Sequence, residues 1–169
     1  MIMFNLNTAD IVVDLASQTL YLPKQHKTYP ISSGKNGIGE QENSGKTPRG
    51  WHRIAEKFGH TAPINAVFIA RQPTGEVYSD TLAAEYPDRD WILSRILWLD
   101  GLEEGFNRGE GCDSKQRYIY IHGTPDTQPT GIPMSHGCIR MRNTDLIELF
   151  EVIPEQALVY ISEIKVEMS

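Results

Sequence analysis

Apolar residues occupy every second position of residues 11–15 and again of residues 20–22. A period of two is typical of a β-strand with one buried face, so these stretches predict a hairpin that turns at residues 16–18. A third strand is predicted over residues 28–33, and it runs into a glycine-rich loop over residues 34–50. The chain therefore begins as β-structure.

Two later stretches are apolar on both faces. Residues 91–99 and, apart from the first position, residues 117–122 show no alternation, which is typical of strands in the middle of a packed sheet. Further strands are predicted over residues 51–58, 66–70 and 157–161. The pattern as a whole predicts a mostly β protein.

One helix is predicted, over residues 144–152. Asn143 or Thr144 suits its N-cap, because a short polar side chain can accept a hydrogen bond from the free N–H groups of the first turn. Residues 61–86 form the least regular segment, which we interpret as a lid or flap. No repeat or linker rich in Pro, Gly or Ser divides the chain, so we expect a single domain over residues 1–169.

The composition agrees with one globular domain. The 169 residues are 40% hydrophobic and 22% charged, and 16 Lys and Arg against 22 Asp and Glu give a net charge of −6. An acidic protein lacks the basic surface that nucleic acid or an anionic membrane requires, so neither is expected as a partner. Two cysteines, Cys112 and Cys138, are too few for a disulfide framework and fit a reducing compartment.

The first 22 residues do not resemble a secretion signal. Such a signal needs a basic start and an uninterrupted apolar stretch of about 7–15 residues. Residues 1–22 contain no Lys or Arg, and Asn5, Asn7, Asp10 and Asp14 interrupt every apolar run. No stretch approaches the roughly 18 consecutive apolar residues of a membrane span. We therefore expect a cytoplasmic protein, or a periplasmic one if a leader has been removed.

The glycine-rich loop contains a Gly-Lys-Thr sequence, as phosphate-binding loops do. That motif requires four residues after its first glycine and a helix after the loop. Here five residues separate Gly39 from Gly45, two of them are Glu40 and Glu42, and Pro48 follows the motif. We expect a mobile surface loop here and no nucleotide or other cofactor.

The strongest candidate for chemistry is Cys138, which lies in the sequence Ser-His-Gly-Cys-Ile-Arg. A thiol with a pKa of about 8.5 is mostly protonated at pH 7, so a nucleophilic cysteine needs a base or a cation nearby. His122 ends an apolar strand and would supply that base from a rigid element. Gly137 leaves backbone N–H groups open to a developing oxyanion.

Three interpretations of this stretch stay open on spacing alone. Cys138 is a nucleophile, or it is a small buried hydrophobe and His136 a core histidine, or the histidines and cysteines bind zinc. The 13 residues between His122 and His136, followed by His-x-Cys, do not match the short spacings that zinc sites favour, so no metal is expected. Cys112 has no histidine near it in sequence and is predicted to be a bystander.

These residues resemble the catalytic domain of the L,D-transpeptidase (YkuD-like) family. The resemblance rests on His122-Gly123 followed by Ser-His-Gly-Cys-Ile-Arg over residues 135–140. Ser33-Gly34 and Thr-Pro-Arg-Gly over residues 47–50 resemble further elements of the family, and the likeness spans roughly residues 10–162. It implies an L,D-transpeptidase-like β-sandwich with one or two short helices.

The resemblance also implies a role for each site residue. Cys138 is the nucleophile and His122 the general base and acid, while the carbonyl of Gly123 orients the imidazole. The N–H groups of Gly137 and Cys138 contribute to an oxyanion hole. The expected substrate-binding residues, which shape the pocket, are Ser135, His136 and Arg140, and Arg140 would hold a substrate carboxylate.

The family acts on peptidoglycan stem peptides, so tetrapeptide stems or muropeptides are the expected partners. The thiolate attacks the carbonyl of meso-diaminopimelate, releases D-alanine and leaves a thioester. Water then gives an L,D-carboxypeptidase, whereas an amine gives an L,D-transpeptidase that cross-links the wall or exchanges D-amino acids. The leaderless start and the likeness of Ser94–Gly101 to a leaderless branch favour a cytosolic carboxypeptidase in murein recycling. A non-catalytic module that binds wall fragments or a metal is the alternative from another class.

Overall fold

A computed structural model describes residues 6–167 of the chain. Ten strands make one sheet, and two α-helices and a short 3₁₀ helix (Leu6–Thr8) accompany them. The strands are β1 (Ile11–Asp14), β2 (Thr19–Leu22), β3 (Lys27–Ser32), β4 (Gly50–Phe58), β5 (Ala66–Ile69), β6 (Gln72–Val77), β7 (Ile92–Gly101), β8 (Tyr120–Thr124), β9 (Ile139–Arg142) and β10 (Leu158–Ser162). The helices are α1 (Asp80–Glu85) and α2 (Asn143–Val152). The prediction of a mostly β fold with one or two short helices is confirmed.

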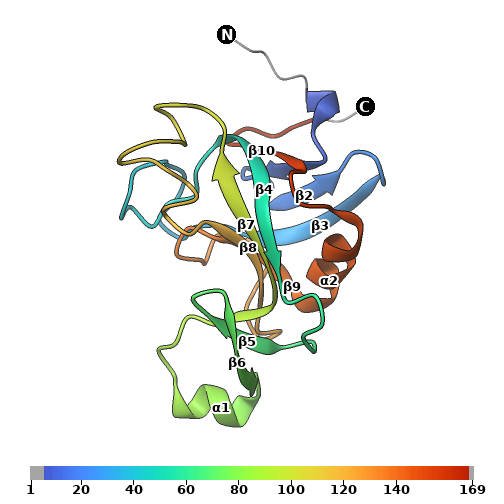
Figure 1. Ribbon diagram of the computed structural model, residues 1–169, viewed down its shortest axis with the longest axis vertical. Coiled ribbons are helices and arrows are strands. Elements are labelled where there is room, and N and C mark those ends of the chain that lie inside the picture. The colour runs from blue at the N-terminus through green and yellow to red at the C-terminus, as the bar shows by residue number, and fades with distance from the viewer. Residues whose placement is uncertain (1–5, 168–169) are drawn as a thin grey trace.

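The sheet closes on itself. Its strands follow the order β4-β10-β1-β2-β3-β9-β8-β7-β5-β6, and β4 also pairs with β7. Eight strands therefore form a closed ring, the body of the molecule, whereas β5 and β6 continue beyond it. With α1 they make an extension at one end of the body (Figure 1). Among the described residues no helix is long and apolar enough to cross a membrane.

The inner face of the ring holds the main core. Side chains from all eight ring strands meet there, and α2 adds Leu146, Leu149 and Phe150. β1 is buried at all four positions, so the expectation that its hairpin has a single buried face is wrong for this strand. The reason is the pairing, because β1 lies between β2 and β10 with one face in the main core and the other against a smaller cluster at Trp51.

Several boundaries differ from the predicted ones. The strand predicted from residue 117 starts at Tyr120, because Tyr118 has a left-handed backbone (φ 57°) that ends the extended run. Helix α2 starts one residue early, and Arg142 caps it without a side-chain hydrogen bond. Asn143 or Thr144 was expected as the cap, but both lie inside the helix, and Asn143 is buried with its amide between Ser94 Oγ and the Thr124 carbonyl.

Two segments that were expected to be irregular have definite structure. Residues 61–86, interpreted as a lid, contain β5, β6 and α1. The loop over residues 34–50 is followed by a strand rather than a helix, in agreement with the rejection of a phosphate-binding loop. The expectation that this segment is a mobile surface loop is wrong at Thr47. This residue is fully buried and hydrogen-bonded to the turn that carries Cys138.

Candidate active site

Cys138 and His122 lie on the same outer face of the ring. Residues of β8 alternate between the faces, and Ile121 points into the main core, so His122 and Tyr120 face outward. On the neighbouring strand, β9, Ile139 also points inward. The parallel register of the two strands aligns Ile139 with Ile121 and Arg140 with His122. Cys138 packs on the outer side against Ala66, Phe68, Ile96 and Tyr120, which we call the side cluster.

The imidazole of His122 is buried and held by its own neighbour. Its Nδ1 lies 2.7 Å from the Gly123 carbonyl oxygen, and a carbonyl only accepts, so Nδ1 carries the hydrogen. Burial lowers the pKa of His122 below its ordinary value, against the opposite effects of Asp90 and of the Gly123 hydrogen bond. The imidazole is therefore neutral near pH 7, and its Nε2 has a free lone pair that can accept a proton.

The Cys138 thiol lies between two backbone groups. Its Sγ accepts a hydrogen bond from the Tyr120 N–H and donates one to the Tyr118 carbonyl, both at 3.3 Å. Burial raises the pKa of Cys138 to about 12 in this arrangement, so the resting side chain is a thiol. Within the described part of the chain no hydrogen bond joins Cys138 to His122, and a nucleophilic role requires the proton to pass to the imidazole.

Gly123 and Gly137 occupy positions that disfavour a side chain, Gly123 by its close neighbours and Gly137 by its backbone. A Cβ on Gly123 would overlap Asn143 Oδ1 and lie 2.5 Å from the Leu93 carbonyl oxygen. Gly137 has a φ of 122°, and its carbonyl accepts from Thr47 Oγ1 at 2.9 Å. Its N–H donates to Ser135 Oγ at 3.1 Å, so one of the two predicted oxyanion donors is already engaged in the turn.

The three predicted substrate-binding residues lie in different environments. Ser135 is buried, and its hydroxyl donates to the Cys138 carbonyl, so it holds the turn around the cysteine. His136 is 76% exposed, with Nδ1 3.3 Å from Asp90. Arg140 is buried and donates to Asp90 Oδ1 at 3.0 Å and to the Met134 carbonyl at 3.3 Å. A carboxylate of the protein thus lies where a substrate carboxylate was expected.

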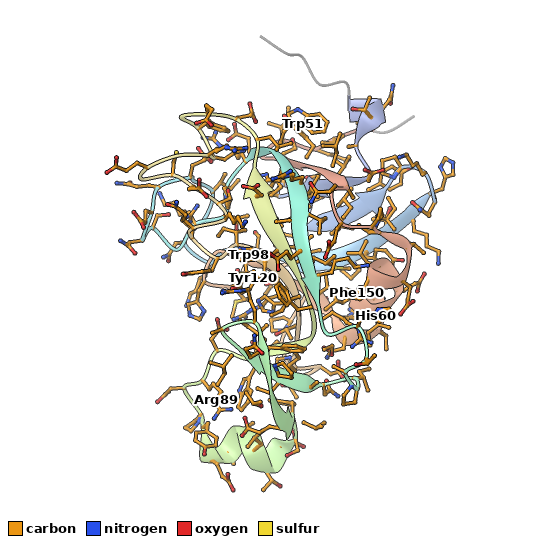
Figure 2. The ribbon with its side chains drawn as sticks, in the orientation of Figure 1. Trp51, His60, Arg89, Trp98, Tyr120 and Phe150 are labelled. Carbon is orange, nitrogen blue, oxygen red and sulfur yellow. The ribbon has the colours of Figure 1, made fainter. Side chains whose placement is uncertain are left out.

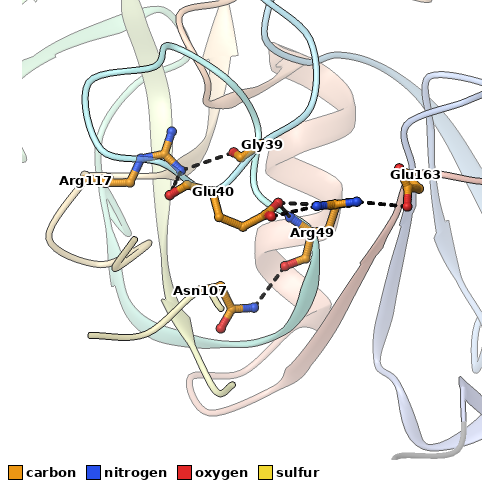
Figure 3. A network of polar contacts seen from close by, with 6 residues as sticks. All are labelled: Gly39, Glu40, Arg49, Asn107, Arg117 and Glu163. Carbon is orange, nitrogen blue, oxygen red and sulfur yellow. Dashed lines mark hydrogen bonds and ion pairs between the residues drawn. The ribbon is translucent and has the colours of Figure 1, made fainter. Parts of the chain in front are cut away.

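Two residues of the site were not found from the sequence. Asp90 precedes β7 and joins the site through Arg140, which is 50 positions away. Arg117 donates to the carbonyl oxygens of Gly39 and Glu40 (Figure 3). It also donates to the carbonyl oxygen of Lys46, and so fixes the loop next to the cysteine turn. Neither residue belongs to a local pattern, because all these partners are distant in sequence.

The loop over residues 34–50 is further held by charged groups. Arg49 pairs with Glu40 at 2.8 Å and with Glu163 at 2.9 Å, and Asn107 donates to the Arg49 carbonyl (Figure 3). Thr47, two residues before Arg49, then bonds the Gly137 carbonyl. The network therefore connects the C-terminal segment to the turn that positions the candidate nucleophile.

Hollows open on both sides of His136. One of about 120 Å³ is lined by Asp90, Thr124 and Arg140, and one of about 250 Å³ by Glu42, Arg117 and Tyr118; His136 lines both. Among residues 6–167 no three His, Cys, Asp or Glu side chains gather as a metal site. The Sγ of Cys112 lies 3.6 Å from the carbonyls of Arg108 and Gly109, and among the described residues no hydrogen bond joins it to His122 or Cys138.

A mostly β domain with a cysteine turn on the same face as a carbonyl-oriented histidine has the two groups that cysteine acyl transfer requires. The family model of the L,D-transpeptidase catalytic domain, YkuD, matches residues 8–161. The chain belongs to this family.

Individual relatives match over shorter or more distant ranges. A YkuD protein of Bacillus subtilis (strain 168) is 47% identical over 49 residues, which is 29% of this chain and 29% of the relative. Among solved structures, L,D-transpeptidase 3 of Mycobacterium tuberculosis with a faropenem-derived adduct is 16% identical with a TM-score of 0.53, over 90% of this chain and 59% of that one. A mutant L,D-transpeptidase of Enterococcus faecium is 18% identical with a TM-score of 0.52, over 91% and 49%. These structures support the fold, and the chain spans only part of each relative.

Proposed function

We propose that the protein cleaves peptidoglycan stem peptides through a thioester on Cys138. The observation that carries this proposal is the hydrogen bond from His122 Nδ1 to the Gly123 carbonyl, on the outer face that Cys138 shares. It fixes the tautomer in which Nε2 can take the thiol proton. The family motif over residues 135–140 supplies the substrate class, because the family acts on peptide stems of peptidoglycan.

The proposed reaction proceeds in two steps. In the first, His122 accepts the proton of Cys138 while the sulfur attacks the carbonyl of meso-diaminopimelate. The C–N bond to D-alanine breaks, and His122 returns the proton to the leaving amine. In the second step, an acceptor attacks the thioester and regenerates the thiol, again with His122 as base.

We propose water as the acceptor, which makes the protein an L,D-carboxypeptidase, in the cytosol and in murein recycling. The likeness of Ser94–Gly101, in the middle of the sheet in β7, to the leaderless branch of the family supports this proposal. Fractionation of the native host, with antibody detection of the protein, tests the compartment. Recovery in the periplasm would reject the recycling role.

Transpeptidation is the second candidate, and one observation favours it. The hollows on the two sides of His136 offer separate places for an acyl donor and an amine acceptor. The products of a tetrapeptide incubation separate the two candidates. A carboxypeptidase releases D-alanine with no amine added, whereas a transpeptidase releases it only with a D-amino acid or a second stem. Cys138→Ala is the inactive reference in both incubations.

A further inference from the structure

The thiol of Cys138 is held by one short segment of backbone, residues 118–120. The carbonyl of Tyr118 accepts its S–H, and the N–H of Tyr120 donates to its sulfur. These two backbone groups are the hydrogen-bond partners of the sulfur in the described structure. The position of this segment therefore determines where the candidate nucleophile lies and how much solvent reaches it.

The segment is not in a relaxed conformation. Tyr118 has a φ of 57°, a left-handed backbone that a residue with a side chain rarely adopts. Such a conformation persists where the surroundings hold it. The ring of Tyr118 is 55% exposed, and its aromatic contact is a stack on Trp98, with centroids 6.2 Å apart and planes at 26°.

Arg71 connects the extension to this segment. It lies in the turn between β5 and β6, and its Nη1 donates to the Tyr120 hydroxyl at 2.9 Å. Its guanidinium also lies over two rings, 4.4 Å from the centroid of Trp98 and 5.2 Å from that of Tyr118. Figure 2 shows Trp98 and Tyr120 together in the middle of the molecule, above β5 and β6.

A planar guanidinium is suited to this position. It can cover aromatic rings with its face and donate from its edge at the same time, which a lysine ammonium cannot do. Arg71 thus holds the side chains of both residues whose backbone binds the sulfur. The β5 residues Ala66 and Phe68 pack in the side cluster with Tyr120 and Cys138, so the extension reaches the thiol by an apolar route as well.

We propose that Arg71 is a positioning residue for Cys138, which keeps residues 118–120 in place and so holds the thiol in its partly buried pose. The inference adds a residue of the extension to the proposed catalytic machinery, and it rests on the proposed function only in treating Cys138 as the nucleophile. Arg71 acts through Tyr118 and Tyr120, and no hydrogen bond joins it to the sulfur in the part of the chain that the structure describes.

Alkylation by iodoacetamide tests this position without any turnover. Each cysteine is followed by peptide mass spectrometry across pH, with Cys112 as the internal reference. Arg71→Ala releases the segment and exposes the thiol, so the Cys138 profile moves about one pH unit lower and the rate at pH 7 rises about tenfold relative to Cys112. Arg71→Lys is expected to give a Cys138 alkylation rate between those of the wild type and Arg71→Ala, since lysine keeps the positive charge but lacks the planar guanidinium.

Arg89 provides the matched control. It also belongs to the extension, donates to Glu76 at 2.9 Å and lies over the rings of Tyr86 and Trp91, but it does not contact residues 118–120. Arg89→Ala therefore loses the same kinds of contact and leaves Cys138 alkylation unchanged. If Arg71→Ala does not fold, Tyr120→Phe decides, because it removes only the hydroxyl that accepts from Arg71 and still raises Cys138 alkylation.

An unchanged Cys138 profile in the folded Arg71 variant, or an equal shift in Arg89→Ala, would overturn the proposal. With the tetrapeptide, Arg71→Ala lowers kcat more than it raises KM, since the nucleophile rather than the substrate is displaced. If Arg71→Ala shows no shift in Cys138 alkylation, the positioning role of Arg71 is contradicted. An alkylation shift without D-alanine release from the wild-type protein leaves that role intact and rejects the proposed function.

Discussion

The body and the extension are stabilised in different ways. In the body, helix α2 buries Asn143, Leu146, Leu149 and Phe150 against a core to which all eight ring strands contribute. In the extension, helix α1 buries none of its six residues, and β6 is exposed at most positions. Its apolar burial is confined mainly to β5, and two arginines, Arg71 and Arg89, add contacts to aromatic rings.

This difference separates stability from site geometry. The body depends on apolar burial, at about 25 cal/mol for each Å² removed from water, so its substitutions act on folding. The extension has smaller apolar clusters, around Ala66, Val67 and Phe68 of β5, and it adds a few polar and ring contacts, which contribute about 1 kcal/mol each. Its substitutions are therefore expected to reach Cys138 through residues 118–120 while the body stays folded.

The largest loss of stability is expected for a substitution at Gly123. In Gly123→Ala the new methyl group overlaps Asn143 Oδ1 and meets the Leu93 carbonyl, and neither can move away inside the packed sheet. We expect a loss of about 4 kcal/mol or more in the free energy of unfolding, measured by urea denaturation.

Gly75→Ala in β6 is the matched control. Gly75 differs from Gly123 in having a left-handed backbone, with a φ of 87°, but no atom lies within 4 Å of the added Cβ, so the loss is about 1 kcal/mol. Equal losses for the two glycines would contradict the difference between body and extension.

Leu97 and Ile69 test apolar burial directly. Leu97 in β7 is fully buried in the main core, whereas Ile69 in β5 is 53% exposed. We expect Leu97→Ala to cost about 3 kcal/mol and Ile69→Ala about 0.5 kcal/mol or less in chemical denaturation. Similar costs would show that the extension is packed as tightly as the body.

His52 makes the stability of the body depend on pH. Burial lowers its pKa to about 4, with Nδ1 on the Gly50 carbonyl and Nε2 on Ser114 Oγ. In the unfolded chain His52 binds a proton near pH 6.5, whereas in the folded chain it stays neutral until about pH 4. Its contribution to the free energy of unfolding is therefore complete above pH 6.5 and falls as the pH drops towards 4.

The loss attributable to His52 is about 3 kcal/mol, and the lowered pKa of His122 adds to it in the same direction. Urea midpoints at pH 7 and pH 4.5 measure the change. His52→Gln reduces this dependence, whereas His26→Gln, on an exposed turn, retains it. A wild-type midpoint that does not change between the two values contradicts the assignment of His52 as a buried neutral group.

The body was largely predictable from the sequence because its strands have patterns of their own. The hairpin of β1 and β2 and the doubly apolar run of β7 were predicted within a few residues. The start of β8 was not, because the left-handed backbone of Tyr118 depends on a stack with Trp98, 20 positions earlier.

The candidate site was predictable only where its residues are close in sequence. His122, Gly123 and the turn around Cys138 form a local motif, and the structure brings them to one face. Asp90 and Arg71 carry no such signal. Their partners Arg140 and Tyr120 lie 50 and 49 positions away, and only the closure of the sheet and the fold of the extension bring them together.

Intact mass after treatment with a carbapenem tests the central claim, an acyl-enzyme on Cys138, most directly. Compounds of this class acylate the nucleophilic cysteine of the family. The wild-type protein and Cys112→Ser are predicted to gain one adduct each, and Cys138→Ala none. An adduct that persists in Cys138→Ala, or its absence from the wild-type protein, would contradict the account.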